Sequence, residues 1–568
     1  MLEFKKEESL DNEITRLTKI TKYISILRLI IALVLIVFLV SLISLKDYLL
    51  YGILSLATLI VMISFILLTN RFYNSLELKK RKKYVYMLHK KRRNKEYSFF
   101  KDTGSDFIDK NDYKELDLDL LGTNSLYQYL AVAKTKKGRT LLAHQLKDPN
   151  KMPKSFTLAI NEMANNEDVL DIEASLYSFD SKAKSVDYDE FLSVKEQIKI
   201  KYFDFLPLLS FILTIIYLIL IFTINLNPYG IIIPVFLNFI STRIIKRHPV
   251  MHLYAIEYYN LCDSYINTIN VINTVKIEND YYNNLIRQIN EEMPKLLSLK
   301  SAYSLLSSRS NIIFLIILNA LFSFDFWVLL LMKRRTKNIE TINKIFDNIA
   351  HVEVMVSFAN IGIDQEVYIV PEESNNFIIK DAYHPLVKNC IPNDLDFNKG
   401  IILTGSNMSG KTTFMRTIGI NQVLYNAGSI VCASYFSSRN IKVLTSLRAN
   451  DMLQEGISTF YAEIIRMKTI NQAIKENKCL ILIDEIFKGT NAYERISASF
   501  KIIEKLNEAG SLFIISTHDF ELCDAAGIMN YHFNESYLDN KISFDYKIKE
   551  GKCESKNALY LLKMADII

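Results

Sequence analysis

The sequence predicts an α/β domain with a parallel sheet at the C-terminal end, an α-helical middle and two membrane-spanning helical hairpins. Long uncharged, mostly aliphatic runs occur before residue 243. Residues 250–365 place Tyr, Leu and Ile at helical spacing with almost no Gly or Pro, and after residue 400 short apolar strands alternate with helical segments. A chain of 568 residues has room for about three to four domains. Half of it is hydrophobic although 23% is charged, so the apolar residues must be concentrated in particular segments.

The first hairpin is predicted at residues 24–70. It contains 17 uncharged residues at 29–45 and, after Lys46 and Asp47, another 23 at 48–70. A helix needs about 20 apolar residues to cross a bilayer, so two antiparallel spans joined by a tight turn are expected. Lys and Arg occur in the segments both before and after the pair of spans. This pattern places both segments in the cytoplasm and the turn outside.

The second hairpin is predicted at residues 205–243. Residues 205–242 form an uncharged run of 38 residues, which the turn sequence Asn-Pro-Tyr-Gly at 227–230 divides into two spans, the second rather short. Basic residues follow it, again on the cytoplasmic side. A pair of buried core helices is the alternative interpretation of this run.

The remaining segments are predicted to be cytoplasmic. They are an N-terminal segment (1–23), a helical region (71–204), a second helical region (244–370) and the α/β domain (371–568). Ten Lys and Arg lie between residues 79 and 95. Such a cluster binds nucleic acid or anionic lipid headgroups, and the second is favoured because the cluster directly follows a span. The six cysteines are scattered without a C-x-x-C pair, which argues against a disulfide framework or a zinc site.

The sharpest motif is a phosphate-binding loop between an apolar strand at 400–404 and a helix from Thr413 onward. Its G-x-x-x-x-G-K-[ST] pattern lets backbone N–H groups turn inward around phosphates. Lys411 is expected to hold the β- and γ-phosphates of ATP, and the Thr412 hydroxyl to bind Mg²⁺. The predicted ATP-binding residues are Gly405, Ser406, Asn407, Met408, Ser409, Gly410, Lys411, Thr412 and Thr413.

Two further strands are predicted to bring acid–base residues to the same sheet edge. The apolar run 479–483 ends in Asp484 and Glu485, the Walker B pattern, so Asp484 is expected to bind Mg²⁺ and Glu485 to polarise the attacking water. The run 512–516 is followed by His518, which is expected to sense the γ-phosphate. Lys411, Glu485 and His518 are the predicted catalytic residues.

The position of ATP decides how a further apolar stretch, residues 311–332, is interpreted. Four spans return the chain to the cytoplasm, whereas a fifth would place the ATP site outside the cell. The stretch also contains Asn319 and Asp325, so we expect a buried helix of a soluble domain. The prediction is therefore a multi-pass protein of the cell membrane with four spans, lipid contacts and a cytoplasmic ATPase domain.

Several segments, in order, resemble the MutS family of DNA mismatch repair ATPases. The resembling segments are YHPLV (383–387), IILTGSNMSGKTTFMR (401–416), GISTF (456–460), LIDEIFKGTN (482–491) and STHDFEL (516–522). A weaker likeness at 126–149 and 351–361 extends the resemblance over more than half of the chain. It implies an α/β P-loop NTPase of the ABC/MutS type at the C-terminal end and an α-helical core and lever domain before it.

The resemblance also implies a homodimer that encloses ATP and Mg²⁺ between its two ATPase domains. Ser458 and Thr459 would form the signature loop that reaches the partner's phosphate site, and Gly489, Thr490 and Asn491 the D-loop. A helix N-cap at Ser458 or Thr459 is the simpler interpretation, and both roles are compatible.

The departures from the family pattern bear on DNA. The first hairpin takes the place of the mismatch-reading domain, and the second lies roughly where the family inserts its DNA clamp. Ser406 and Ser409 replace the usual Pro and Gly, and the position of the adenine-stacking aromatic falls near Cys390 and Ile391.

Two functions remain open at this point. The first is a membrane-anchored MutS-like ATPase coupled to mismatched or structured DNA; the alternative is an ATP-driven membrane switch with no DNA ligand. An ABC-type transporter is disfavoured because Ser458-Thr459-Phe460 stands where an exporter has an LSGGQ-like signature. The spans also contain almost no charge for a substrate pathway.

Overall fold

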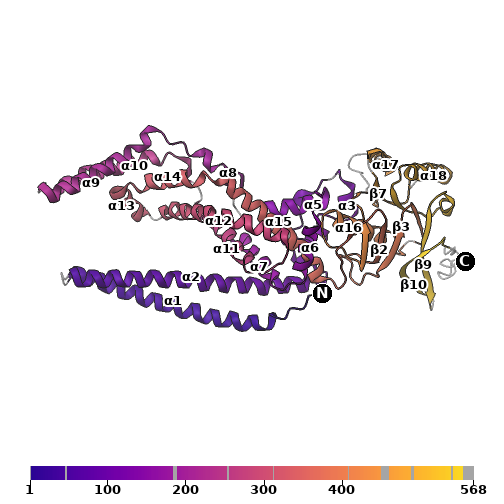
Figure 1. Ribbon diagram of the computed structural model, residues 1–568, viewed down its shortest axis with the longest axis horizontal. Coiled ribbons are helices and arrows are strands. Elements are labelled where there is room, and N and C mark those ends of the chain that lie inside the picture. The colour runs from indigo at the N-terminus through magenta and orange to yellow at the C-terminus, as the bar shows by residue number, and fades with distance from the viewer. Residues whose placement is uncertain are drawn as a thin grey trace.

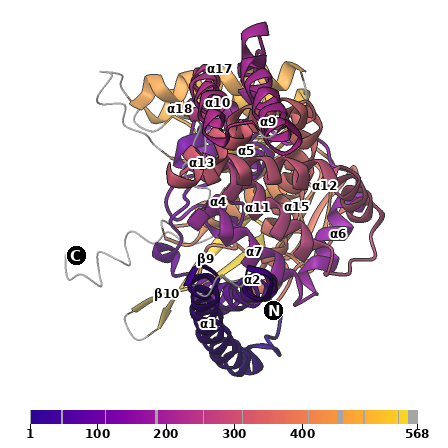
Figure 2. The ribbon, with the colours of Figure 1, turned by 90° about the vertical axis from the view of Figure 1, so that its left-hand side faces the viewer.

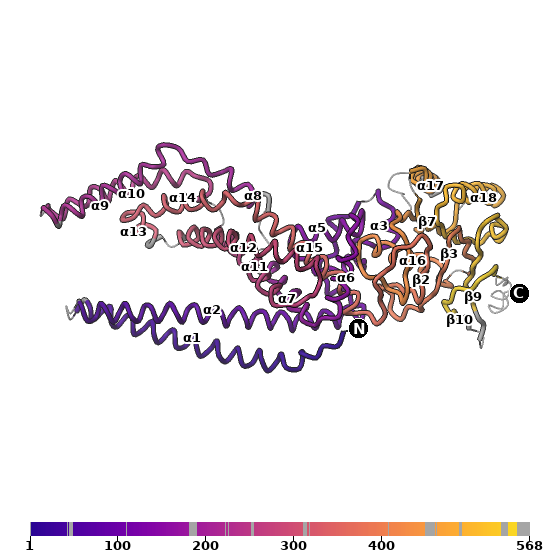
Figure 3. The backbone as a smooth tube through the Cα atoms, in the orientation of Figure 1, coloured from indigo at the N-terminus to yellow at the C-terminus, as the bar shows by residue number. Residues whose placement is uncertain are grey.

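The molecule is elongated, with the α/β domain at one end, a helical middle and two helical arms that extend away from that domain (Figure 1). The computed structural model describes residues 2–44, 48–109, 111–182, 188–224, 226–252, 255–310, 312–406, 408–448, 459–476, 478–487, 491–538 and 541–553. The backbone trace shows both arms running from the helical middle toward the same end of the molecule (Figure 3). Four described helices are long and apolar enough to cross a membrane, and they are the ones predicted.

The first arm is a pair of long helices, α1 (Glu7–Ser44) and α2 (Tyr48–Arg93), packed side by side (Figure 1). The helices extend well beyond the predicted hairpin at 24–70. At about 1.5 Å per residue α2 is roughly 69 Å long, more than twice the ~30 Å hydrocarbon core of a bilayer. The sequence after residue 70 contains no Gly or Pro up to residue 100, so nothing ends the helix where the apolar run ends.

Most of the basic cluster at 79–95 lies on α2, and many of its side chains are paired within the protein. Four of them bind carboxylates of α1 and of α7 (Val169–Lys182), and contact with lipid headgroups or nucleic acid stays a prediction. The bonds are Lys79–Glu13 (2.8 Å), Lys82–Asp171 (2.8 Å), Lys83–Asp11 (2.5 Å) and Lys90–Glu7 (2.7 Å). The positive charge of α2 is therefore largely neutralised within the protein.

At its base, α2 enters a fully buried charged cluster. His89 lies between Glu173 of α7 and Asp364 at the end of α15 (Ile339–Asp364), 2.9 Å from a carboxylate oxygen of each. Both ring nitrogens face acceptors, so both donate, which requires the protonated imidazole. Arg92 reaches Glu173 at 3.4 Å and Arg93 reaches Asp364 at 3.2 Å.

The second arm contains α9 (Leu206–Ile224) and α10 (Ile232–Ile245), joined by a short 3₁₀ turn at Pro228–Ile231. Asn227 caps this turn by accepting a bond from the Tyr229 amide at 3.0 Å. The far ends of both arms point away from the α/β domain (Figure 1), and in the end-on view the two arms lie apart (Figure 2). A single membrane can therefore receive both hairpins, with the α/β domain on one side.

The expectation of one buried helix at 311–332 was wrong. After α12 (Asp280–Ser307), two helices follow, α13 (Ile312–Phe322) and α14 (Phe324–Thr336). They are separated at Ser323, whose φ of 48° lies in the left-handed region and interrupts the helical path. Several large apolar side chains of the pair are exposed, so the segment is not the interior of a soluble domain.

The helical middle packs around α15, in which every residue from 352 to 364 is buried. Side-chain caps begin its neighbours: Thr135 accepts from the Gly138 amide and Asn279 from the Tyr281 amide. The remaining helices are α3 (Tyr113–Asp117), α4 (Leu126–Leu130), α5 (Lys136–Lys147), α6 (Lys154–Ala164), α8 (Tyr188–Gln197) and α11 (Ala255–Ile272), with 3₁₀ turns η1 (Tyr97–Phe99), η2 (Ser105–Phe107), η3 (Tyr202–Phe205), η5 (Pro249–His252) and η6 (Ser308–Ser310).

The α/β domain contains two sheets. The larger has the order β10-β9-β4-β8-β7-β6, with β10 antiparallel and the other five strands parallel to their neighbours. The three strands predicted from the sequence are its centre, and each is almost fully buried because helices cover both faces. The strands are β4 (Ile401–Thr404), β6 (Lys442–Ser446), β7 (Cys479–Asp484), β8 (Leu512–Ser516), β9 (Met529–Leu538) and β10 (Lys541–Glu550).

The smaller sheet has the order β1-β5-β2-β3, and three of its strands precede the phosphate-loop strand in the chain while β5 follows α16. Its strands are β1 (Glu372–Glu373), β2 (Phe377–Ala382), β3 (Asn393–Phe397) and β5 (Tyr435–Ser438). The domain's helices are α16 (Lys411–Asn426), α17 (Thr459–Glu476) and α18 (Ala492–Glu508), with the 3₁₀ turn η8 (Phe520–Asp524). Between β2 and β3, residues 387–391 form one wall of the pocket described next.

Candidate nucleotide site

The predicted phosphate loop connects β4 to α16 and curls at the carboxyl end of the central strand. Gly405 (φ 141°) and Gly410 (φ 105°) adopt backbone conformations that favour glycine. A Cβ on Gly405 would lie 2.7 Å from the Phe533 carbonyl oxygen of β9, so the loop also needs a residue without a side chain there. The N-terminus of α16 then begins at Lys411, directly beneath the loop.

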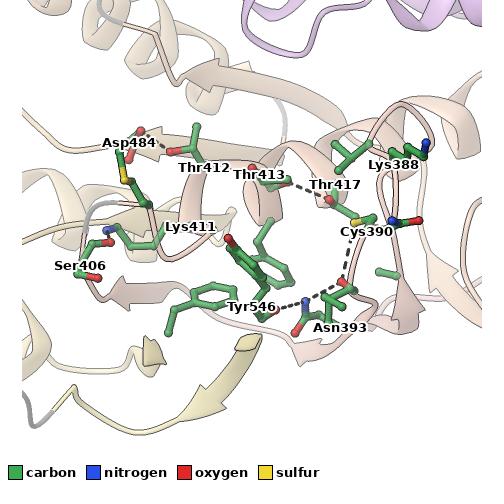
Figure 4. Close-up of a pocket in the computed structure, with 18 of the residues that line it drawn as sticks. Lys388, Cys390, Asn393, Ser406, Lys411, Thr412, Thr413, Thr417, Asp484 and Tyr546 are labelled. Atoms are coloured by element: carbon green, nitrogen blue, oxygen red, sulfur yellow. Dashed lines mark hydrogen bonds between the residues drawn. The ribbon is translucent and has the colours of Figure 1, made fainter. Parts of the chain in front are cut away.

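Lys411 lies inside the loop, as the motif predicts. Its Nζ donates to the carbonyl oxygens of Gly405 (2.7 Å) and Ser406 (2.8 Å), and the side chain is almost completely buried (Figure 4). The ammonium group therefore stands next to backbone N–H groups and a helix N-terminus, an arrangement that favours a phosphate. The predicted Ser406, Met408, Gly410, Thr412 and Thr413 line the same pocket. Ser409 is buried and bonds to the Ser406 carbonyl oxygen, while Asn407 lies outside the described residues.

Thr412 and Asp484 meet across the first turn of α16 and the end of β7. The Thr412 hydroxyl donates to Asp484 Oδ2 at 2.8 Å (Figure 4). The Ser516 hydroxyl bonds to the other carboxylate oxygen. A hydroxyl and a carboxylate are the hard oxygen ligands that Mg²⁺ prefers, and both lie beside Lys411. The donor set thus fits a Mg²⁺ ion.

Glu485 and His518 face each other at the ends of β7 and β8. His518 Nε2 lies 3.3 Å from Glu485 Oε1. Partial burial and the Lys411 charge lower the pKa of His518, despite the nearby carboxylates, so the neutral imidazole predominates at pH 7. Glu485 has a φ of 61°, a left-handed conformation that turns the chain at the strand end. Sequence reasoning thus placed both groups at the correct edge of the sheet.

The pocket has a second wall that the sequence did not reveal. A cavity of about 520 Å³ extends from Lys411 to Val387, Cys390 and Ile391, and Tyr546 of β10 lies between these ends (Figure 4). Asn393 fixes this tyrosine by donating to its carbonyl oxygen at 2.9 Å, and Tyr546 itself has a φ of 52° at an irregularity in the β9–β10 pairing. An aromatic side chain from a strand distant in the sequence thus lines the pocket near residues 390–391.

The family-derived loop assignments lie largely outside the described residues. Ser458, Gly489 and Thr490 are not described, and Thr459 is the first residue of α17. Asn491 caps α18, because its side chain accepts from the Tyr493 amide at 3.1 Å. These trans-acting roles therefore stay predictions.

The base of the first arm is bonded to the chain segment that immediately precedes the pocket wall. Beyond α2, Lys95 donates to the Pro385 carbonyl oxygen and the Tyr97 hydroxyl to that of Leu386 at 3.2 Å. On the opposite side of α16, Asp119 bonds to Arg416 at 3.2 Å and Arg448 at 2.6 Å. The helical region thus touches the α/β domain on two sides of the phosphate loop.

Comparison with known proteins agrees with this geometry. Residues 401–567 match the model for MutS domain V. This part of the chain is therefore similar to MutS domain V. The DNA mismatch repair protein MutS of Caldicellulosiruptor bescii is 31% identical over 249 residues, and that of Fusobacterium nucleatum is 34% identical over 238. The human MutS protein homolog 4 is 31% identical over 250 residues.

These matches are confined to part of each protein. They cover 39–41% of this chain, less than the extent expected from the resemblance, and 25–29% of the MutS relatives. The chain thus spans less than a third of the length of the curated relatives it matches. The likeness to MutS therefore concerns the nucleotide domain and its immediate neighbourhood.

Proposed function

We propose that this protein is a membrane-anchored, Mg²⁺-dependent ATPase whose catalytic unit is a dimer of MutS-type domains. The observation that carries the proposal is the convergence of Lys411, Thr412, Asp484 and Glu485 at the carboxyl edge of one parallel sheet. MutS relatives supply the expectation of ATP hydrolysis. The four apolar helices and their common direction support the anchoring.

Each residue has a defined task in this proposal. Lys411 exchanges its loop carbonyls for the β- and γ-phosphate oxygens, and Thr412 and Asp484 hold Mg²⁺. The bound ion supplies charge neutralisation on the phosphate oxygens. Glu485 accepts a hydrogen bond from the attacking water, while neutral His518 orients Glu485 and can donate to the γ-phosphate.

The part of the cavity between the phosphate loop and residues 387–391 suits the adenine base. Tyr546, whose ring lies next to Gly410, offers a surface for stacking, and Cys390 and Ile391 give an apolar edge. Tyr546→Ala should weaken ATP binding while leaving single-turnover hydrolysis of bound ATP nearly unchanged, because the ring supplies neither a proton acceptor nor a metal ligand to the reaction. Equal losses of ATP affinity and of the single-turnover hydrolysis rate would contradict this assignment.

The catalytic proposal is tested with two variants of the full-length protein in nanodiscs. Lys411→Ala should abolish ATP binding, measured with a fluorescent ATP analogue. Glu485→Gln should bind ATP, lower the turnover number by about 10²–10⁴-fold and accumulate an ATP-bound dimer. Lys399→Ala and Glu494→Gln are matched controls, since both side chains are exposed away from the pocket. Normal hydrolysis by Glu485→Gln would refute the catalytic assignment.

Two candidates remain for the process that ATP hydrolysis drives. The first is mismatched or structured DNA, which the names of the MutS relatives suggest. The second is a membrane switch without DNA, which the ion pairs of the 79–95 cluster favour, because they engage basic side chains that could otherwise contact DNA. Binding of mismatched and perfect duplexes to nanodisc-embedded protein across a salt series separates them. Saturable, salt-dependent binding supports the first candidate, and its absence at low salt supports the second.

A further inference from the structure

A stretch of exposed apolar side chains lies outside the four predicted spans, on α13 and the start of α14. Ile316 is 48% exposed, Leu321 41%, Phe322 51% and Trp327 45%. α13 itself contains no charged residue. Its 11 residues are about 16 Å long, too short to cross a ~30 Å hydrocarbon core. A water-exposed surface of this kind would be unfavourable, at about 25 cal/mol per Å².

This surface continues the exposed face of the second hairpin. α13 packs against α10, and Figure 1 shows it beside the arm at the end of α12 far from the α/β domain. The rings of Phe322 and Trp327 lie 6.5 Å and 6.3 Å from the ring of Phe211, which is one turn inside α9. The exposed residues are therefore level with the beginning of a membrane-spanning helix.

The turn between α13 and α14 is satisfied by protein groups rather than by solvent. Buried Asn238 of α10 donates to the Ala320 carbonyl oxygen at 2.9 Å and accepts from the Ser323 hydroxyl. Ser323 also bonds to the Pro207 carbonyl oxygen at 2.7 Å, and Asn319 accepts from the Asp325 amide at 2.8 Å. Non-helical backbone is tolerated at membrane depth only when its polar groups are bonded within the protein, as they are here.

Charged residues lie next to this surface on the side toward the α/β domain. Asp325 is fully buried and paired with Arg309 at 2.8 Å. Lys333 and Arg334 are exposed near the end of α14, about 9 Å along the helix from Trp327. Basic residues at this distance suit anionic headgroups, and tryptophan is typical of the membrane–water interface.

We infer that α13 and the first turn of α14 insert into the cytoplasmic leaflet as a re-entrant element that contacts lipid without crossing the membrane. The occupant of the exposed face is the lipid monolayer around α9 and α10. The inference rests on the proposed membrane anchoring, and it leaves the number of spans at four, so the α/β domain stays in the cytoplasm.

The single tryptophan of the chain makes the inference directly testable. Full-length protein is placed in nanodiscs of phosphatidylcholine and phosphatidylglycerol that carry bromine either near the headgroup or near the chain end. Trp327 emission should be quenched severalfold more strongly by the shallow bromine than by the deep one. In the Trp327→Phe background, Phe322→Trp reports the end of α13 and should behave in the same way.

Two controls in the Trp327→Phe background separate this inference from the anchoring proposal. Leu33→Trp on α1 reports a span, and Tyr493→Trp on α18 reports an exposed site of the α/β domain. If Leu33→Trp is quenched and Trp327 behaves like Tyr493→Trp, the re-entrant element is refuted while anchoring stands. If Leu33→Trp is also unquenched, the anchoring proposal fails. Protection of Trp327 from both bromolipid and aqueous acrylamide would assign the face to a protein partner and overturn the inference.

Discussion

At its base, the α1–α2 arm is held by a cluster of buried charges, whereas the α9–α10 arm is held by neutral amides and hydroxyls together with two separate contacts, Arg309–Asp325 and His248–Asp204. His89, Arg92 and Arg93 of α2 meet Glu173 and Asp364. In the other arm, Asn238 connects with Ser210 of α9 and with Ser323, and an Arg309–Asp325 pair lies beside them.

This difference has an energetic consequence. Removing one partner of a buried ion pair leaves an uncompensated charge, which typically costs about 3–5 kcal/mol. Hydrogen bonds between helices at membrane depth contribute less, about 0.6–1.7 kcal/mol each. The first arm should therefore be rigidly attached to the helical middle. At the base of the second arm, a substitution should lower the opening free energy less.

The largest effect is expected for Glu173→Ala. The substitution leaves His89 and Arg92 buried without this carboxylate, so the local opening free energy of α7 and the base of α2 should fall by about 3–5 kcal/mol. Hydrogen exchange of the nanodisc-embedded protein measures this quantity segment by segment. Asp11→Ala is the matched control, because Asp11 pairs with Lys83 at the surface and should cost at most about 1 kcal/mol. Equal effects of the two variants would contradict the comparison.

The same carboxylate predicts a pH dependence. Burial alone would raise the pKa of Glu173, but the charges of His89 and Arg92 outweigh it and lower this pKa below its ordinary value of 4.5. The folded state therefore holds the proton less tightly than the unfolded state. The stabilisation from Glu173 is complete above pH 4.5 and is lost as the pH falls through the folded pKa. The difference in stability between wild type and Glu173→Gln should shrink on acidification.

Glu353 of α15 provides a control with the opposite sign. It is buried among the Lys134 and Thr135 amides and the Thr135 hydroxyl, and burial raises its pKa to about 7. Stability from this group should fall as the pH rises from 4.5 to 7, and Glu353→Gln should remove that fall. If both glutamate variants shifted the profile in the same direction, the proposed origin of the Glu173 effect would be wrong.

A smaller effect is expected for Asn238→Leu. The change removes the acceptor of Ser210 and Ser323 and the donor to Ala320, at a cost of about 1–2 kcal/mol in the opening of α13 and α14. Protection of α7 should not change. Thr223→Ala is the control, since the Thr223 hydroxyl bonds only within its own helix, to Ile219, among the contacts described. A loss as large as that for Glu173→Ala would remove the distinction between the arms.

The smallest effect is expected at the far end of the second arm. The Tyr217 hydroxyl donates to the Asn227 carbonyl oxygen at 2.9 Å. Tyr217→Phe removes this bond at an exposed position, so the opening of the α9–α10 turn should change by about 0.5–1 kcal/mol. Hydrogen exchange of residues 226–231 checks this, with α13 as the internal reference. A loss of hydrogen-exchange protection in α13 as well would show that the two ends of the arm open together.

The sequence predicted the phosphate side of the pocket because local motifs encode it. Lys411 and Thr412 follow a glycine loop whose geometry is local, and Asp484, Glu485 and His518 lie at strand ends that a parallel sheet brings together. Tyr546 could not be found in this way. It reaches the pocket from a strand more than a hundred residues away, through an irregular pairing that no spacing rule predicts.

Partners distant in sequence also explain two features that the sequence did not reveal. The 79–95 cluster has the composition of a solvated basic patch, but its acidic partners lie in α1, α7 and α15. Residues 311–332 were assigned by asking whether the run crosses the membrane or stays in the cytoplasm. A helix that turns back at Ser323 fits neither alternative, and the turn depends on Asn238, which lies far away in the chain.

The uninterrupted length of α2 links membrane geometry to nucleotide affinity. A tilt of about 5° about its base moves the far end by roughly 6 Å, since the helix is about 69 Å long. Arg93 at its base and Lys95 just beyond it bond to the end of α15 and to Pro385, two residues before the pocket-lining Val387. If two tilts differ in their affinity for ATP, thermodynamic reciprocity requires ATP to shift the tilt by the same factor. Bilayer thickness, which biases helix tilt, would then act as an allosteric effector of the enzyme.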